Sequence, residues 1–241
     1  MRSTTAEDYL KAIFHLSQDG GPAATTAIAD RLGLAAGTVT GMLKRLAERG
    51  LVDHVPYYGA RLTGEGEASA LMLVRRHRLL ELFLVRQLGY GWDRVHDEAE
   101  RLEHAVSDEL IETIAAHLGE PSQDPHGAPI PVRGQPYRDP GFPVLANLEV
   151  GVTAVLRQVP DEDGEALRYL ARLGLTPGAE LVLLDRAPFG GPLRVLVNGV
   201  ERHLGKELSS HLHVELRLAR RTHHSQPGVQ RVVQRTERTN A

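Results

Sequence analysis

The sequence predicts a mostly α-helical protein with one small β domain: an N-terminal winged helix-turn-helix, a helical middle part and a C-terminal β-barrel. Three observations favour this fold class. The first 65 residues read as three helices and a β-hairpin, residues 66–120 read as further amphipathic helices, and residues 144–220 read as short strands separated by turns.

Capping residues mark the first two helices. The pattern Thr4-x-x-Glu7 predicts a capping box, in which the threonine and the acid three residues later bond each other's backbone amides. Thr25 or Thr26 is expected to cap a second, short helix over residues 27–32.

A third helix, residues 38–49, follows a short turn at residues 34–37 that ends in glycine. Two short helices joined by such a turn are typical of a helix-turn-helix. Residues 51–55 and 60–63 read as strands and are expected to form a hairpin wing. The order helix, helix, helix, hairpin, helix favours a winged helix over other small three-helix domains.

The helix predicted over residues 93–106 carries two imidazoles and two carboxylates on one narrow face. At about 100° per residue, the side chains on this face are His96, Glu100, Glu103 and His104. In the preceding long helix, residues 64–88, His77 and Glu81 share a face because they are four residues apart. No lysine stands four residues after the acids of the narrow face, so a divalent transition metal explains this face better than a solvated charged surface does.

The chain then changes in character. A last helix is expected over residues 108–118, and the seven prolines from Pro121 to Pro143 indicate a linker. Strands are expected at 153–156, 180–184, 193–197 and 213–216, with a short helix at 166–173. Several short strands at close spacing favour a small barrel.

These patterns divide the chain into five segments. They are a DNA-binding winged helix at 1–65, a helical dimerisation and metal-binding domain at 66–120, a proline-rich linker at 121–143, a barrel at 144–220 and a disordered basic tail at 221–241.

The composition excludes several classes of protein. The chain has no cysteine, which excludes disulfides, thiolate zinc sites and cysteine nucleophiles. It has neither an apolar run long enough to span a membrane nor a signal-peptide pattern, so a cytoplasmic protein without a membrane partner is expected. Residues 22–63 carry five basic and three acidic side chains, whereas residues 64–118 carry six arginines and eleven acids. A basic segment beside an acidic one fits DNA contact beside cation binding.

Four sequence strings together are highly specific. They are Arg76-His77-Arg78-Leu79-x-Glu81, Val95-His96-Asp97-Glu98-Ala99-Glu100-x-x-Glu103-His104, Ser107-Asp108-Glu109 and Asp124-Pro-His-Gly-x-Pro-Ile-Pro131. Through them the sequence resembles the diphtheria toxin repressor family of metal-dependent regulators, including its manganese-sensing branch, over about residues 3–220. The stretch 173–178 is similar to the SH3-like domain of that family and of the ferrous-iron transport accessory protein.

The resemblance implies two neighbouring metal sites. The first would use His77, Glu81 and His96, and the second would use Asp8, Glu100, Glu103 and His104. Iron-sensing members place methionine and cysteine where this chain has Asp8 and Glu100. Oxygen ligands in place of sulfur favour Mn²⁺ over Fe²⁺. We expect Co²⁺, Ni²⁺, Zn²⁺ or Cd²⁺ to substitute in vitro.

The sequence departs from the family pattern at two places. Manganese sensors of the family commonly carry glutamate where this chain has Lys11, which speaks against a two-ion centre of their kind. The glutamate and glutamine that the family's barrel contributes to the first site fall on Ala166 and Tyr169, with Glu165 and Asp163 as nearby acids. Whether the barrel donates a ligand is left open.

The function predicted is that of a metal-dependent DNA-binding transcriptional regulator, a repressor by resemblance, of metal-homeostasis genes. The N-terminal residues of the recognition helix are expected to contact base edges, and these are Ala36, Gly37, Thr38 and Thr40. The candidates for phosphate contacts are Thr26, Lys44, Arg45 and Arg61. A helix-turn-helix protein usually works as a two-fold dimer, so a homodimer on a palindromic operator is expected, without a small-molecule substrate.

Two other classes of function remain as alternatives. A metal-dependent hydrolase or oxygenase could use the same histidines and glutamates, but the sequence has neither an HExxH motif nor the Glu-x-x-His pairs of di-iron enzymes. A metal-binding adaptor without DNA activity is suggested by the barrel alone. A mobility-shift assay with and without Mn²⁺ separates the regulator from both.

Overall fold

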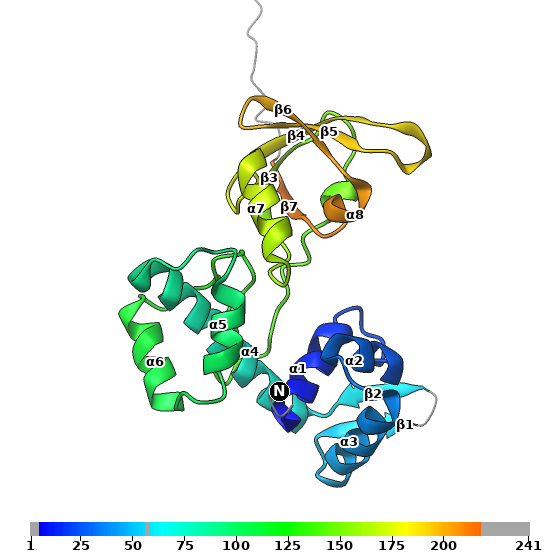
Figure 1. Cartoon of the computed structure of the whole chain (residues 1–241), viewed down its shortest axis with the longest axis vertical. Coiled ribbons are helices and arrows are strands. Elements are labelled where there is room, and N and C mark those ends of the chain that lie inside the picture. The colour runs from blue at the N-terminus through cyan, green and yellow to red at the C-terminus, as the bar shows by residue number, and fades with distance from the viewer. Residues whose placement is uncertain (1–4, 56–57, 218–241) are drawn as a thin grey trace, which may run out of the picture.

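The computed structural model describes residues 5–55 and 58–217, which form three parts with separate buried cores (Figure 1). They are an N-terminal winged helix, a helical part, and a five-stranded antiparallel sheet with helices packed on it. The predicted fold class, mostly α with a small SH3-like β domain, is confirmed. The predicted tail, residues 221–241, lies outside the described residues.

The winged helix has the predicted order of elements. These are α1 (Ala6–Leu16), α2 (Thr25–Leu32), α3 (Ala36–Glu48), β1 (Val52–Val55) and β2 (Gly59–Leu62). The two strands pair antiparallel, with Val52 opposite Leu62 and Val55 opposite Gly59. Fully buried residues from all three helices, such as Ile13, Ile28 and Leu43, form one core with the strands.

The capping predictions need correction. The capping box of α1 uses Thr5 and Asp8, one residue later than expected: the Asp8 carboxylate accepts from the Thr5 amide at 2.6 Å. Threonines and acids occur in adjacent pairs here, so the spacing alone permits both registers. Helix α2 starts earlier than expected, with Ala24 as a cap that makes no side-chain hydrogen bond, so the predicted caps Thr25 and Thr26 are wrong. Helix α3 likewise begins two residues before the predicted start.

The helical part contains three helices around a core of leucines and isoleucines. They are α4 (Gly64–Leu88), α5 (Val95–Leu102) and α6 (Asp108–His117). Helix α4 begins at the Thr63 cap and ends at Gly89, whose φ of 70° fits a left-handed cap. Helix α5 is shorter than the predicted 93–106, because the amide of Ala105 bonds Leu102 in a tighter turn and Ser107 already caps α6.

The C-terminal part is a sheet in the order β6-β5-β4-β3-β7. Its elements are η1 (Leu145–Asn147), β3 (Thr153–Gln158), α7 (Gly164–Leu173), β4 (Glu180–Arg186), η2 (Pro188–Gly190), β5 (Leu193–Val197), β6 (Val200–Leu204), α8 (Lys206–Ser209) and β7 (His213–Leu216). The four predicted strands are present, and β6 was missed. It is an edge strand in which only Leu204 is buried, so its sequence carries little apolar signal.

From α6 the linker runs between the other two parts and up to the sheet, which lies above them in Figure 1. Helix α7 of the sheet part points toward the place where the other two parts meet. Contacts join the parts there: Arg168 of α7 pairs with Asp93 before α5 at 3.0 Å. Within the described ranges, no helix combines the length and apolar character that crossing a membrane requires.

Candidate metal centre and DNA-binding surface

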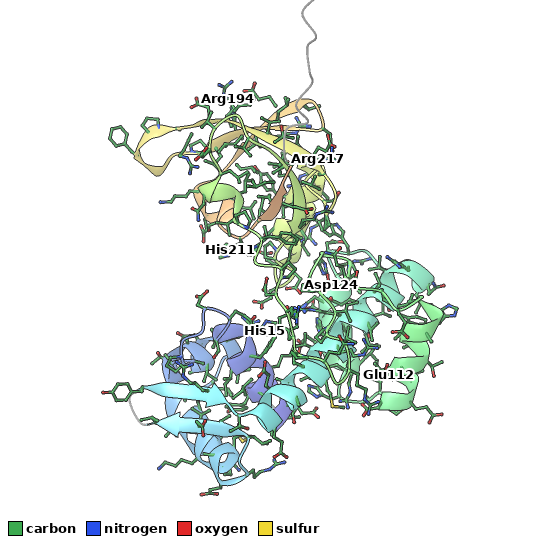
Figure 2. All side chains as sticks on the ribbon, turned by 180° about the vertical axis from the view of Figure 1, so that it is seen from behind. His15, Glu112, Asp124, Arg194, His211 and Arg217 are labelled. Atoms are coloured by element: carbon green, nitrogen blue, oxygen red, sulfur yellow. The ribbon has the colours of Figure 1, made fainter. Side chains whose placement is uncertain are left out.

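A cavity of about 590 Å³ lies where the three parts meet, and its walls come from α1, α4, α5 and the loop after β3. Figure 2 shows Asp124 close to this meeting point, with His15 on the winged-helix side and His211 on the sheet side. Titratable side chains from distant parts of the sequence therefore converge around one cavity.

The first group of possible ligands lies between α4 and α5. Nε2 of His77 lies 3.1 Å from Oε1 of Glu81, because the two residues are one helical turn apart on the buried face of α4. Nδ1 of His96 lies 3.4 Å from the same oxygen. The structure thus brings together the three residues that the sequence suggested for one site, and adds Asp161, whose Oδ2 lies 4.0 Å from Nδ1 of His96.

The second group joins α1 to the turn after α5. Nε2 of His104 lies 2.8 Å from Oδ1 of Asp8 and 3.5 Å from Oε1 of Glu103, and Glu103 is fully buried. The other oxygen of Asp8 is held by the Thr5 amide, so the helix cap fixes the position of this carboxylate. Three of the four residues expected for a second site are therefore together.

The fourth residue, Glu100, belongs to an adjacent group that shares Glu103 with the second one. We call it the lysine junction: Lys11, His77, Glu100 and Glu103. Nζ of Lys11 donates to Oε1 of Glu100 at 2.5 Å and to the two oxygens of Glu103 at 3.1 and 2.9 Å. It also lies 3.2 Å from Nδ1 of His77. The ammonium group thus joins α1 to α4 and to the α5 region.

A further group, which we call the barrel junction, contains Glu81, Asp124, His126 and Asp161. Oδ1 of Asp124 accepts from the amides of His126 and Ala128 at 2.8 and 2.9 Å, which closes a tight turn. Gly127 within this turn has φ of 89°, and a Cβ there would lie 1.8 Å from the Arg157 carbonyl of β3. The glycine therefore lets the linker lie against the sheet.

The barrel junction contains buried polar atoms that lack hydrogen-bond partners among the described residues: Oε2 of Glu81, Oδ2 of Asp124 and Nδ1 of His126. Nε2 of His126 is bonded to the Trp92 carbonyl at 2.8 Å, which leaves Nδ1 directed at Oε2 of Glu81, 3.7 Å away. Buried polar groups are usually paired, so these atoms mark a place that suits a ligand. A backbone carbonyl on the far nitrogen is also the usual support of a metal-binding histidine.

The charges of these groups depend on one another. Burial and Lys11 oppose a charge on His77, but Glu81 and Glu103 outweigh them and raise its pKa to about 9. Burial also opposes a charge on His126, but Glu81 raises its pKa to about 9. Burial and the charge of Glu81 raise the pKa of Asp124 to about 7. The charge on Glu81 therefore shifts the pKa of each of these side chains: it favours the charged histidines and disfavours a charged Asp124.

The residue of the barrel that reaches the centre is Asp161, and none of the four barrel positions considered from sequence belongs to the groups found among the described residues. Asp163 instead caps α7, since its carboxylate accepts from the amides of Glu165 and Ala166 at 2.8 and 3.2 Å. Tyr169 lies further along the same helix, partly covered by Arg172. The neighbouring Glu162 pairs with Arg31 of α2, so this loop also contacts the winged helix.

The candidate DNA-contacting residues lie on the winged helix. Ala36, Gly37 and Thr38 are exposed in the first turn of α3, and Lys44 and Arg45 are exposed further along it. Thr40 is half-buried and its hydroxyl donates to the Ala36 carbonyl at 2.9 Å. Thr26 is exposed in the first turn of α2, and Arg61 of the wing donates to the Gly20 carbonyl at 2.8 Å. All eight lie on α2, α3 or the wing.

Sequence reasoning missed Asp124, His126 and Asp161 as members of the centre. Asp124 and His126 belong to the string Asp124-Pro-His-Gly-x-Pro-Ile-Pro131. The Asp-x-His pair within this proline-rich segment is the pattern that could have indicated them as ligands. Asp161 follows a strand in an ordinary acidic loop, Asp161-Glu162-Asp163, and no local pattern distinguishes it from its neighbours.

Comparisons with known proteins agree with this arrangement. Family models described as the N-terminal DNA-binding domain and the metal-binding and dimerisation domain of iron-dependent repressors match residues 1–60 and 63–132. A FeoA domain model matches residues 144–216.

Full-length relatives match as well. The iron-dependent repressor IdeR of Mycobacterium tuberculosis (strain H37Rv) is 32% identical over 209 residues, covering 82% of this chain and 90% of the relative. The diphtheria toxin repressor of Corynebacterium efficiens is 30% identical over 222 residues, covering 88% and 95%. The solved structure of a manganese-dependent transcriptional repressor in complex with manganese superposes with a TM-score of 0.82 and 41% identity, covering 87% of this chain and 99% of that one.

Proposed function

The chain belongs to the family of iron-dependent repressors and is a divalent-metal-dependent, DNA-binding transcriptional regulator, and we propose that the ion to which it responds is Mn²⁺, with Fe²⁺ as the second choice. Membership of this family rejects the hydrolase or oxygenase alternative and the adaptor without DNA activity. The family's dimerisation domain supports a homodimer.

The residues of the centre fit a divalent cation. Three buried polar atoms of the barrel junction lack partners among the described residues, and all of them are oxygen or imidazole nitrogen. No methionine is among the described residues that line the cavity, and the chain has no cysteine. The absence of sulfur favours Mn²⁺ over softer ions, and this donor set is the observation that carries the choice of metal. Co²⁺, Ni²⁺, Zn²⁺ and Cd²⁺ share enough of these preferences to substitute in vitro.

We assign the ligands by the groups in which they lie. His77, Glu81, His96 and Asp161 would hold one ion, and Asp8, Glu103 and His104 would hold another. Asp124 and His126 would extend the first site through the second oxygen of Glu81. Glu100, also expected as a ligand, is bonded to Lys11.

The ligands come from three parts of the chain, and this explains how metal would control DNA binding. Asp8 is on α1 of the winged helix, His104 follows α5, and Asp161 is on the sheet. A bound cation supplies the positive charge that allows these carboxylates to lie together. Asp8 then ties α1 to His104 of the helical part, while Glu162 beside Asp161 pairs with Arg31 of α2 and ties the winged helix to the sheet.

We propose that α3 enters the major groove with Ala36, Gly37, Thr38 and Thr40 at base edges, while Thr26, Lys44, Arg45 and Arg61 contact phosphates. A two-fold dimer would place two such helices about 34 Å apart on a palindromic operator in the cytoplasm. If the ion binds more tightly when the winged helix is held in the DNA-binding orientation, the protein should bind metal more tightly on DNA than free in solution.

The test is a titration of operator DNA by fluorescence anisotropy, with Mn²⁺, Fe²⁺ or Zn²⁺ and with a chelator. The operator is first obtained by selecting bound sequences in the presence of Mn²⁺. Mn²⁺ should strengthen binding by the scale of typical allosteric coupling, about 5–150-fold, and operator should tighten Mn²⁺ binding by the same factor. Equal DNA affinity in Mn²⁺ and chelator would reject the proposal, and a response to Fe²⁺ alone would reject the choice of metal.

A further inference from the structure

The lysine junction has the composition of a metal site whose centre is taken by an amino group. His77, Glu100 and Glu103 each offer one ligand atom, and these atoms all lie within 4.8 Å of one another. Nζ of Lys11 contacts an atom of each of the three residues, at 3.2, 2.5 and 2.9 Å. The ammonium group therefore stands among the atoms that would otherwise surround a divalent ion.

Burial distinguishes this contact from an ordinary surface ion pair. The Lys11 side chain is 12% exposed and the Glu103 side chain is 0% exposed. The Lys11 ammonium holds the pKa of Glu100 below its ordinary value, although burial opposes this. Both carboxylates of the junction thus have their positive partner within the chain itself. Glu103 has it where solvent does not reach, whereas the Glu100 side chain is 35% exposed.

The residue type suits this position. The chain has three lysines, Lys11, Lys44 and Lys206, among 28 lysine and arginine residues. A lysine ammonium is a compact charge that donates in three directions, whereas the planar guanidinium of arginine needs a wider, fork-shaped acceptor. Two carboxylates that converge on one point therefore match lysine better than the more common arginine.

We propose that Lys11 is a built-in cation that excludes a divalent ion from the His77–Glu100–Glu103 group and ties α1 to α5 independently of the metal supply. Metal binding is then confined to the neighbouring groups, at Asp8–Glu103–His104 and around Glu81. The inference rests on the proposed metal-dependent function, and it specifies which of the clustered acids respond to metal. Unlike a bound ion, the ammonium group is covalently attached and does not dissociate.

The first experiment counts bound Mn²⁺ per chain by equilibrium dialysis and elemental analysis of the full-length protein. Lys11→Glu replaces the cation by a ligand and should bind one more Mn²⁺ per chain than wild type. Lys11→Arg keeps the charge and should bind the wild-type number. Lys206→Glu makes the same change in net charge at an exposed position on α8 and should also leave the number unchanged.

A second substitution assigns the added ion to its place. In the Lys11→Glu background, Glu100→Gln should remove the added ion, whereas in wild type Glu100→Gln should leave the number of ions unchanged. Circular dichroism and light scattering verify that each variant keeps its fold and oligomeric state. If folded Lys11→Glu binds no more Mn²⁺ than wild type, or if Glu100→Gln alone removes an ion, Lys11 does not occupy a metal position.

Hydrogen exchange in the presence of a chelator tests the tie between helices. The α1 amides, residues 6–16, should exchange faster in Lys11→Gln than in wild type, while those of α6 should not change. Equal exchange of α1 in both proteins would overturn the tie. These outcomes do not depend on DNA, so they remain distinct from failure of the proposed regulation, which a metal-independent DNA affinity would reveal.

Discussion

The lysine junction and the barrel junction are built from the same kinds of side chains but differ in where their positive charge comes from. At the lysine junction, the Lys11 ammonium bonds Glu100 and Glu103 directly. At the barrel junction, Glu81, Asp124 and His126 each keep a buried atom without a hydrogen-bond partner within the described chain. The acids of the lysine junction are therefore paired with a lysine and need no ion, whereas those of the barrel junction have no such lysine in the described part of the chain.

The difference has an energetic consequence. A buried polar group without a partner costs about 1–3 kcal/mol, and more if it is charged. The barrel junction holds three such atoms, and Nε of Arg78 lies 3.6 Å from Oδ2 of Asp124, which is beyond hydrogen-bond distance. A bound cation would remove this cost, which makes the barrel junction the stronger candidate for responding to metal. The lysine junction gains no comparable benefit.

Glu81→Gln should have the largest effect, because Glu81 directs one oxygen at His77 and His96 and the other at His126. Loss of outer partners of metal ligands typically lowers affinity about 10–100-fold, so loss of this shared carboxylate should exceed about 100-fold for Mn²⁺. Calorimetric titration with Mn²⁺ measures this loss of affinity. The control is Glu109→Gln, because Glu109 is an exposed acid on α6. Unchanged Mn²⁺ affinity in folded Glu81→Gln would remove the barrel junction from the metal centre.

Gly127→Ala should have an intermediate effect, which originates where the linker packs against β3 beside the barrel junction. The added Cβ meets the Arg157 carbonyl at 1.8 Å in a left-handed conformation, so the free energy of unfolding should fall by about 2–4 kcal/mol from strain and overlap. Urea unfolding followed by circular dichroism measures this loss.

Gly134→Ala is its matched control, since Gly134 also has a positive φ of 71° but nothing within 4 Å of the added Cβ. It should lose only about 1 kcal/mol. If the two variants are equally stable, close packing of the linker against β3 does not hold the barrel junction in place.

Lys44→Ala should have the smallest effect on the metal centre, because Lys44 is exposed on α3 and lies outside both junctions. Its removal should weaken binding to all DNA sequences and flatten the slope of log K against log salt by about 0.9, as expected for one phosphate contact. Mn²⁺ affinity in the absence of DNA should stay at the wild-type value. A changed preference at one base pair with the original slope would instead indicate that Lys44 reads a base.

Local patterns in the sequence determined most of the fold. The 25-residue helix α4 was predicted with its bounds, and in the structure Thr63, which was predicted as the end of a strand, caps its start while Gly89 ends it. The strands β5 and β7 were also predicted with their bounds. Errors occurred where the local signal is weak or ambiguous, as at the adjacent threonines before α1 and the exposed edge strand β6. Helix periodicity also grouped His77 with Glu81, since that contact is made within one helix.

The contacts that complete the centre were decided only by tertiary structure. Asp161 is one of three acidic residues in a loop, and its Oδ2 lies 4.0 Å from Nδ1 of His96 because the sheet packs against the end of the helical part where α5 begins. Lys11 was visible as an unusual residue, but its bonds to Glu100 and Glu103 span about 90 positions of the chain. Periodicity describes which side chains share a face of one element. The distance between faces of different elements depends on how those elements pack, and no local pattern contains that information.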